Sequence, residues 1–175
     1  MAKRQVERRT SRAARQRRWI AVVVVLVIAA AGVGYFAYRA AADLPGARMP
    51  DQGNRHVQNG EPHEPYNSDP PTSGPHLPYI APWGVHTRPV QLELQVHNLE
   101  DGGVVVQYNC ECPELVDQLR KIVQGYDKQV ILAPYSAMKT RIALTAWTRI
   151  ETMENFDERR IRRFIDAYRG IDHHR

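Results

Sequence analysis

The sequence has little cysteine and lacks several motifs that would identify a function directly. Only two of its 175 residues are cysteine, Cys110 and Cys112, and one residue separates them. The sequence contains no Cys-x-x-Cys and no His-x-x-x-His motif, which excludes the common spacings of zinc ligands. A Gly-x-Ser-x-Gly nucleophile elbow and internal repeats are also absent. The function therefore has to be inferred from other features.

One uncharged run of twenty residues, 19–38, is predicted to be a transmembrane helix. As a helix it would be about 30 Å long, which matches the hydrocarbon core of a bilayer. Aromatic residues near both ends of the run, Trp19 and Tyr38 among them, are typical of membrane interfaces. We interpret the run as an uncleaved signal anchor. The alternative is a cleaved signal peptide, because Ala40, Ala41 and Ala42 supply small residues for a cleavage site.

The charge distribution predicts the orientation of this helix. Residues 1–18 carry eight Lys or Arg and one acidic residue, Glu7, a net charge of +7. By the positive-inside rule this tail is cytoplasmic and the C-terminal part lies outside the cytoplasm of the cell. The whole chain has a formal charge of +5, so the exported part is mildly acidic. We expect the lipid bilayer as a partner and no nucleic acid, because topology and anionic lipids explain the basic tail.

Composition and the positions of structure-breaking residues divide the chain into five predicted parts. Pro and Gly without apolar periodicity mark a lead-in loop, and regular structure begins only near residue 90. The parts are a basic cytoplasmic tail (1–18), a transmembrane helix (19–38), a stalk or lead-in loop (39–65), an extracytoplasmic domain (66–170) and a tail (171–175).

The extracytoplasmic domain is predicted to be α+β. Alternating apolar residues indicate a strand over 90–97, which we expect to pair as a hairpin with a second strand over 104–108. A helix is predicted over 113–124, with Cys112 at its N-cap, and another over 156–169, capped by Asn155 or Asp157. Strands are predicted over 129–133 and 140–151. This ββαββα order predicts a mostly antiparallel four-stranded sheet with two helices on one face.

The segment from Tyr66 to His76, the proline-braced segment, is the most unusual part of the chain. Pro70, Pro71 and Pro75 stiffen its backbone, so it is neither a helix nor a flexible linker. It belongs to a long Pro-rich loop that its aromatic residues are expected to pack onto the domain. Histidine is dense around this segment, a composition that indicates a metal site; the histidines are His56, His63, His76, His86 and His97.

Three groups of residues carry a resemblance to a known family. They are Tyr66-Asn67-Ser68-Asp69-Pro70-Pro71-Thr72-Ser73-Gly74-Pro75-His76, then Val96-His97-Asn98-Leu99-Glu100 with Gly102-Gly103-Val104-Val105, and finally Ala143–Trp147 with Phe164–Gly170. Over roughly residues 55–170 the chain resembles a bacterial family catalogued as domain of unknown function 3105. The resemblance implies a membrane-anchored or exported protein without an agreed activity. The family pattern often resembles Leu-Glu-His-Gly after the first histidine, and this chain has Asp101 in place of the second histidine. The difference implies either a weaker imidazole-based site or an oxygen ligand at this position.

Our main hypothesis is a transition-metal site formed by His76 and His97. Further candidate ligands are Cys110, Cys112 and His63, followed by His86 and Asp101. Imidazole and thiolate together suit copper or zinc, and the protein would capture or relay the ion. The alternative is that the histidines only hydrogen-bond to backbone carbonyls and fix the loop.

The two cysteines allow a second interpretation. A disulfide across one residue would close a small, strained ring, so we predict a thiol pair instead. At the helix N-terminus the thiolate of Cys112 would be favoured, although Glu111 opposes it, and it would bind a soft metal or exchange with Cys110.

Two further functions remain open. A cell-envelope interaction module would use Tyr66, Tyr79 and Trp83 as anchors. A hydrolase-like enzyme would use a hydroxyl beside His76, with a carboxylate orienting the imidazole; the candidates are Ser68, Thr72, Ser73, Asp69 and Glu100. We assign no catalytic residue, and interpret His173-His174 as a frayed tail.

Overall fold

The computed structural model describes residues 2–42 and 44–174, which divide into two compact units, Met1–Leu44 and Pro45–Arg175. The first unit is a single helix, α1 (Ala2–Ala42). Its segment Arg17–Phe36 has a mean hydropathy of 2.5 and is long and apolar enough to cross a membrane. A membrane anchor and a signal sequence both meet this criterion of length and composition.

The second unit is built on one mixed sheet, which contains six strands in the described part of the chain. Its spatial order is β1-β6-β5-β3-β4-β2. The pairs β3–β4 and β2–β4 are parallel, and the pairs β3–β5, β5–β6 and β1–β6 are antiparallel. The strands are β1 (Ala47–Arg48), β2 (Gly84–Val85), β3 (Val104–Tyr108), β4 (Val130–Pro134), β5 (Ile142–Ala146) and β6 (Arg149–Met153).

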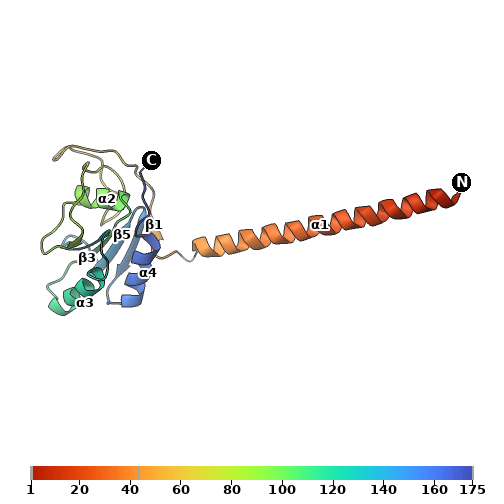
Figure 1. The fold of residues 1–175 in the computed structure, drawn as a ribbon. Coiled ribbons are helices and arrows are strands. Elements are labelled where there is room, and N and C mark those ends of the chain that lie inside the picture. The colour runs from red at the N-terminus through yellow and green to blue at the C-terminus, as the bar shows by residue number, and fades with distance from the viewer. Residues whose placement is uncertain (1, 43, 175) are drawn as a thin grey trace. The chain divides into compact units, whose positions relative to one another are not determined.

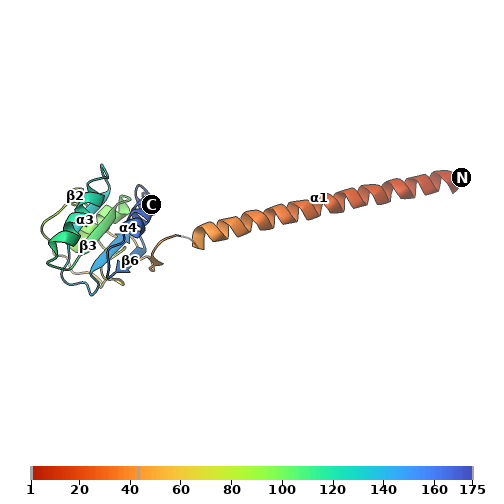
Figure 2. The ribbon, with the colours of Figure 1, turned by 90° about the horizontal axis from the view of Figure 1, so that it is seen from below.

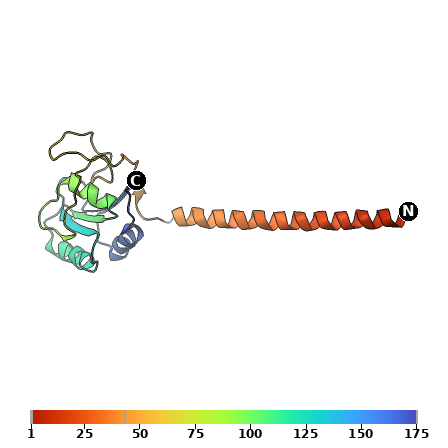
Figure 3. The same cartoon turned by 45° about the horizontal axis from the view of Figure 1, so that its top comes forward.

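Helices cover both faces of this sheet, which gives three layers (Figure 1). Helices α3 (Pro113–Val123) and α4 (Glu158–Tyr168) lie on one face of the sheet. Figure 2, which views the ribbon from below, shows both helices in front of the strands. Helix α2 (Leu92–Glu100) lies on the opposite face, under the loops that precede it (Figure 3). Two apolar cores result. Phe164, Ile161 and Leu119 belong to the core under α3 and α4, and Val96 and Leu99 to the core under α2.

Several predicted elements are present close to their expected bounds. Strand β3 coincides with the predicted 104–108 strand, and β4 lies one residue beyond the predicted 129–133 strand. Helix α3 begins at Pro113 with Cys112 as its N-cap. In α4 the N-cap is Asp157, whose side chain accepts a hydrogen bond from the backbone N–H of Arg160. A capping carboxylate stabilises this end because it satisfies a free N–H group at the positive end of the helix dipole.

The predicted strand over 90–97, and with it the hairpin to β3, is wrong. These residues begin helix α2, which is buried from Gln95 to Glu100 because the sheet covers one side and loops cover the other. A helix enclosed on all sides loses the 3.6-residue alternation of polar and apolar residues. The prediction of a four-stranded, mostly antiparallel sheet is wrong for the same reason, since β3 pairs with β4 and β5 instead.

The predicted strand over 140–151 is in fact a hairpin of β5 and β6. Trp147 and Thr148 form the connection, and Thr148 has a φ of 56°. Two backbone hydrogen bonds hold this residue: its N–H donates to Thr72 O at 2.9 Å, and its carbonyl accepts from Met49 N–H at 2.9 Å. These contacts replace the Asn-Gly signal that usually marks a tight hairpin. They also attach the proline-braced segment to the sheet.

Replacing Asn98 by alanine is expected to lower the free energy of unfolding by about 2–4 kcal/mol. The buried Asn98 amide donates to Ala81 O and accepts from Ala81 N–H, both at 2.9 Å, so its loss leaves two buried backbone groups unpaired. Urea denaturation of the full chain in mild detergent would measure this. The control is Asn109→Ala, which removes one half-buried bond to Met138 O and should cost about 1 kcal/mol. Equal costs would contradict the role given to Asn98.

Candidate metal centre

Three separate segments bring four candidate ligands together. Helix α2 supplies His97 and Glu100, and the proline-braced segment supplies His76. His56 comes from the lead-in loop, where it pairs with His76 as an isolated parallel β-bridge. The bridge is held by hydrogen bonds from Val57 N–H to His76 O (2.8 Å) and from His76 N–H to Arg55 O (3.0 Å). We call His56, His76, His97 and Glu100 the inner cluster.

The proline-braced segment is fixed by its own hydrogen bonds. Tyr66 Oη donates to Pro75 O at 2.6 Å, which ties the two ends of the segment together. Gly74 has a φ of 116°, and a Cβ there would lie 3.3 Å from the Tyr66 ring. Glycine is therefore favoured at this turn on both conformational and steric grounds. The segment reaches His76 in one conformation, with the imidazole pointing into the domain.

The donor atoms of the inner cluster lie close enough to bind one ion. One ligand atom from each of the four residues falls within 4.8 Å of the others. Glu100 Oε2 lies 2.9 Å from His76 Nε2 and 3.8 Å from His56 Nε2. Two donors bound to one tetrahedral zinc ion would lie about 3.3 Å apart. His76 and Glu100 are fully buried, His97 is nearly so, and His56 leaves the cluster open to solvent on one side.

Hydrogen bonding fixes the orientation of the His76 ring. Its Nδ1 lies 2.7 Å from Gly74 O, and a carbonyl can only accept, so Nδ1 carries a proton and donates it. The other ring nitrogen, Nε2, lies 2.9 Å from Glu100 Oε2. Two acceptors 2.9 Å apart require a proton or a cation between them. An N–H donated to a backbone carbonyl is also the usual support of a metal-bound histidine.

Two buried atoms of the inner cluster have no hydrogen-bond partner within the described residues: His97 Nδ1 and Glu100 Oε1. Burial lowers the pKa of His97 below its ordinary value, against the opposing influence of Asp101. The neutral form of this imidazole is therefore favoured, and only the neutral form can bind a metal. A buried polar atom without a partner is costly, and both of these atoms belong to residues of the inner cluster.

A second group of ligands adjoins the inner cluster and shares His97 with it. His97, Asp101 and His174 form this outer group. His174 Nε2 lies 3.5 Å from Asp101 Oδ1 and 3.4 Å from Glu100 Oε2. The His174 imidazole also contacts Asp172 at 2.8 Å, and this hydrogen bond raises the pKa of His174.

The C-terminal segment is attached to the end of α2 and to the sheet. Gly170 N–H donates to Gly102 O at 2.8 Å, and His173 N–H donates to Glu100 O at 2.9 Å. The His173 ring stacks on Trp147 with centroids 5.9 Å apart. The interpretation of His173-His174 as a frayed tail therefore differs from the structure, which orders this segment beside the cluster.

The structure separates the predicted metal ligands. His76 and His97 come together, whereas His63 lies elsewhere, with Nδ1 bonded to Glu64 O and Nε2 3.3 Å from Glu93. The hydrogen bond to Glu64 O raises the pKa of His63. His86 donates to Pro82 O and, like His63, belongs to neither cluster among the described residues.

Cys110 and Cys112 also lie outside both clusters, and a disulfide joins them, which corrects the prediction of a thiol pair. The thiol pair was predicted because the disulfide would close a small ring. The two Cα atoms are 5.3 Å apart, a distance that a disulfide can span.

Sequence reasoning counted His56 among the dense histidines without naming it as a ligand, interpreted His174 as part of a frayed tail, and considered Glu100 only as a partner for imidazole. His56 lies in the segment predicted as stalk, and His174 is remote in sequence from the others. Glu100 carried one usable signal, because Leu99-Glu100 directly follows His97-Asn98 and falls three residues from His97, on the same side of a helix. The wrong assignment of 90–97 as a strand concealed that spacing.

The hydroxyl groups proposed for a hydrolase-like relay are engaged elsewhere. Ser73 Oγ accepts a hydrogen bond from Gln52 N–H at 3.0 Å, and Ser68 Oγ lies 3.3 Å from Thr72 Oγ1. The His76 ring instead contacts Glu100, the imidazoles of His56 and His97, and the indole of Trp147.

The chain belongs to the family described as protein of unknown function (DUF3105), whose pattern matches residues 56–174. The match begins at His56 and ends at His174, so it contains both groups of candidate ligands. No curated protein and no solved structure matches the chain.

Proposed function

We propose that the protein binds a divalent transition-metal ion, Zn(II) or Cu(II), at His56, His76, His97 and Glu100. The carrying observation is the pair of unpartnered buried atoms, His97 Nδ1 and Glu100 Oε1, in a cluster whose donor atoms lie within 4.8 Å of one another. Buried polar groups are nearly always hydrogen-bonded, so two orphans in one cluster indicate a group that binds there.

The chemistry of the donor set favours particular metals. Three imidazoles and one carboxylate suit zinc and Cu(II), whereas Cu(I) prefers the softer thiolates and thioethers. The disulfide of Cys110 and Cys112 removes the thiolates that the sequence offered. With its three imidazoles neutral, the inner cluster has the Glu100 carboxylate as its one charged ligand, which attracts a divalent ion.

The proposed role is capture and holding of the ion outside the cytoplasm. The basic N-terminal residues and the apolar segment Arg17–Phe36 support an anchor with its N-terminus inside and the second unit outside. The partially exposed His56 gives the ion a route to the buried ligands. An ion held by a preorganised set of side chains can later pass to a partner with a stronger site.

The test is a metal titration of the full chain, purified in detergent micelles without an affinity tag. Isothermal calorimetry with Zn(II), Cu(II) and anaerobic Cu(I) would give the stoichiometry and affinity. The expected result is one tightly bound divalent ion per chain. The Glu100→Gln variant, which keeps the shape of the side chain but removes its charge, should bind about 100-fold more weakly, ~2.7 kcal/mol.

The matched control is the double variant His63→Ala/His86→Ala, which removes two histidines outside the cluster. Its affinity should equal that of the unmodified chain. Metal binding that this control abolishes, or that Glu100→Gln leaves intact, would show that the ion binds elsewhere. Absence of tight binding in the folded chain would overturn the proposal.

Cu(II) is expected to quench the fluorescence of Trp147 on binding. The indole lies 6.2 Å from the His76 ring, centroid to centroid, and is almost fully buried. A paramagnetic ion at the inner cluster would therefore be in close range of Trp147. Stopped-flow fluorescence would follow the quenching, and the Trp147→Phe variant should lose most of it. A signal that persists unchanged in that variant would contradict the assigned location.

A further inference from the structure

The disulfide between Cys110 and Cys112 has no evident part in the metal site or in the stability of the fold. The two residues are the only cysteines in the chain, and their bond spans one residue, Glu111. The stabilisation from a disulfide grows with the length of the loop that it closes, and this loop is close to the shortest possible. Both side chains are half-buried and Glu111 is exposed, so solvent reaches this bond.

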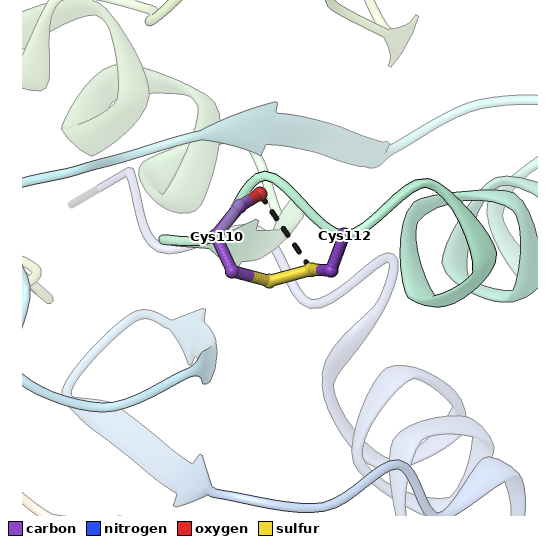
Figure 4. The surroundings of a disulfide bond; sticks show 2 residues. All are labelled: Cys110 and Cys112. Atoms are coloured by element: carbon purple, nitrogen blue, oxygen red, sulfur yellow. Dashed lines mark hydrogen bonds between the residues drawn. A yellow bond between two sulfur atoms is a disulfide. The ribbon is translucent and has the colours of Figure 1, made fainter.

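The bond lies at the N-terminus of an eleven-residue helix. Cys110 follows the end of β3, and Cys112 is the N-cap of α3, directly before Pro113 at the first helical position. The Cys112 side chain forms no capping hydrogen bond within the described structure. Free N–H groups of the first turn and the positive end of the dipole stabilise a thiolate at this position. Figure 4 shows Cys112 Sγ beside the carbonyl oxygen of Cys110, 3.6 Å away.

Two open cavities lie against the disulfide. One has a volume of about 470 Å³ and is lined by Cys112 together with apolar Leu115 and Phe156 and charged Arg141. The other, about 580 Å³, is lined by both cysteines and by Tyr108 and Pro134. They give an extended polypeptide segment room beside the disulfide, with apolar surface for its side chains.

The position of the disulfide in the sheet topology supports a redox role for it. Strands β3 and β4 are parallel and joined through α3, and the antiparallel strands β5 and β6 and helix α4 follow them. In thioredoxin-like proteins a redox-active cysteine pair, spaced as Cys-x-x-Cys, accompanies a βαβ unit. Cys110 and Cys112 lie in the βαβ unit of β3, α3 and β4, with one residue between them instead of two. The likeness is a topological analogy, and the exposed disulfide and its cavities are observed independently of it.

We propose that Cys110–Cys112 is a redox-active disulfide that exchanges with the cysteine thiols of an extended polypeptide segment. A substrate thiolate attacks Cys110 Sγ, forms a mixed disulfide and releases Cys112 as the thiolate that the helix end stabilises. A lower-pKa thiol leaves faster, which directs the attack to Cys110. The second thiolate of the substrate then attacks the substrate sulfur of the mixed disulfide and releases Cys110 as a thiolate. The substrate dithiol loses two electrons and two protons to become a disulfide, and the two cysteines gain them as thiols.

The exchange would be tested with the oxidised full chain in detergent micelles and a reduced synthetic peptide containing two cysteines. Thiols trapped with a maleimide reagent would be counted by mass spectrometry. The expected result is one peptide disulfide formed per chain within minutes, with the chain still folded by circular dichroism. A peptide that remains reduced, or a bond that reacts only after the chain is unfolded in urea, would overturn the proposal. The Cys110→Ser/Cys112→Ser chain controls for oxidation by air.

Two single variants test the role of the helix end. In Cys110→Ser the thiol of Cys112 should be alkylated by iodoacetamide at pH 7 about tenfold faster than the thiol of Cys110 in Cys112→Ser. Equal rates, or a faster Cys110, would contradict the assignment of Cys112 as the leaving group. The His63→Ala/His86→Ala chain, whose substitutions lie outside both the disulfide and the candidate metal centre, should oxidise the peptide at the unmodified rate.

Discussion

The His76→Ala/His97→Ala chain is expected to bind Zn(II) and Cu(II) at least about 1,000-fold more weakly than the unmodified chain, ~4 kcal/mol. Two of the four inner ligands are removed, and His56 and Glu100 alone leave an ion half-coordinated. His97 is almost fully buried beside the other ligands, so its replacement removes a side chain that the fold already holds in position. Calorimetric titration of both chains under the same conditions would measure the difference.

This double variant also changes the stability of the metal-free chain. His76 is fully buried and contacts Glu100, so its removal leaves a buried carboxylate with fewer partners. The urea midpoint of the metal-free variant must therefore be measured beside the affinity. The two single variants separate the effects, because His97→Ala leaves the His76–Glu100 contact in place and should still weaken binding strongly. If the folded double variant kept tight binding, the inner cluster would not be the metal centre.

Replacing Phe164 by alanine is expected to reduce the free energy of unfolding by about 3–5 kcal/mol. Phe164 is fully buried in the core beneath α3 and α4 and packs edge-on against Tyr168, with ring centroids 4.9 Å apart. It also closes the space beside Gly46, where a Cβ would lie 2.7 Å from the Phe164 ring. The cavity left by truncation would therefore reach from α4 to the residues that lead into β1.

Urea denaturation of the full chain, followed by tryptophan fluorescence, would measure this loss. Phe156→Ala is the matched control because it truncates the same side chain at a partly buried position on the same core. It should cost about 1–2 kcal/mol. A similar cost at both positions would contradict the view that Phe164 is central to this core.

Helices α3 and α4 could be predicted from sequence because each has one face exposed. In α4 the buried residues Ile161, Phe164, Ile165 and Tyr168 are separated by charged residues that face solvent, and such a pattern identifies a helix reliably. Helix α3 offered the same pattern and a proline at its first position. Strand β3 is a run of β-branched residues bounded by glycine, which favours a buried strand.

Helix α2 could not be recognised by periodicity because it is covered on both sides. Residues 90–97 alternate between apolar and polar by chance, and the helix then continues into Asn98, Leu99 and Glu100, all fully buried. Intrinsic propensity was the better indicator, since Leu92-Glu93-Leu94-Gln95 consists of strong helix formers. The consequence for the site is direct, because only a helix brings His97 and Glu100 to the same side.

The candidate metal centre was predictable only in part, because its ligands come together through tertiary contacts. His76 and His97 were identified from composition and from the proline-braced segment. His56 depends on an isolated parallel bridge, and His174 on hydrogen bonds from residues 170 and 173 to the end of α2. Neither contact has a local sequence signal. Asp101 lies beside the imidazole of His174 from the C-terminal segment, with Asp101 Oδ1 3.5 Å from His174 Nε2.

The order of the sheet has a consequence for association between copies of the chain. Both edge strands, β1 and β2, are only two residues long. Unpaired backbone groups along an edge are what a second molecule uses to extend a sheet, and an edge of two residues offers few of them. Two such short ends make the sheet a poor template for growth. The length of its edge strands alone therefore disfavours growth of the sheet by edge-to-edge pairing between copies.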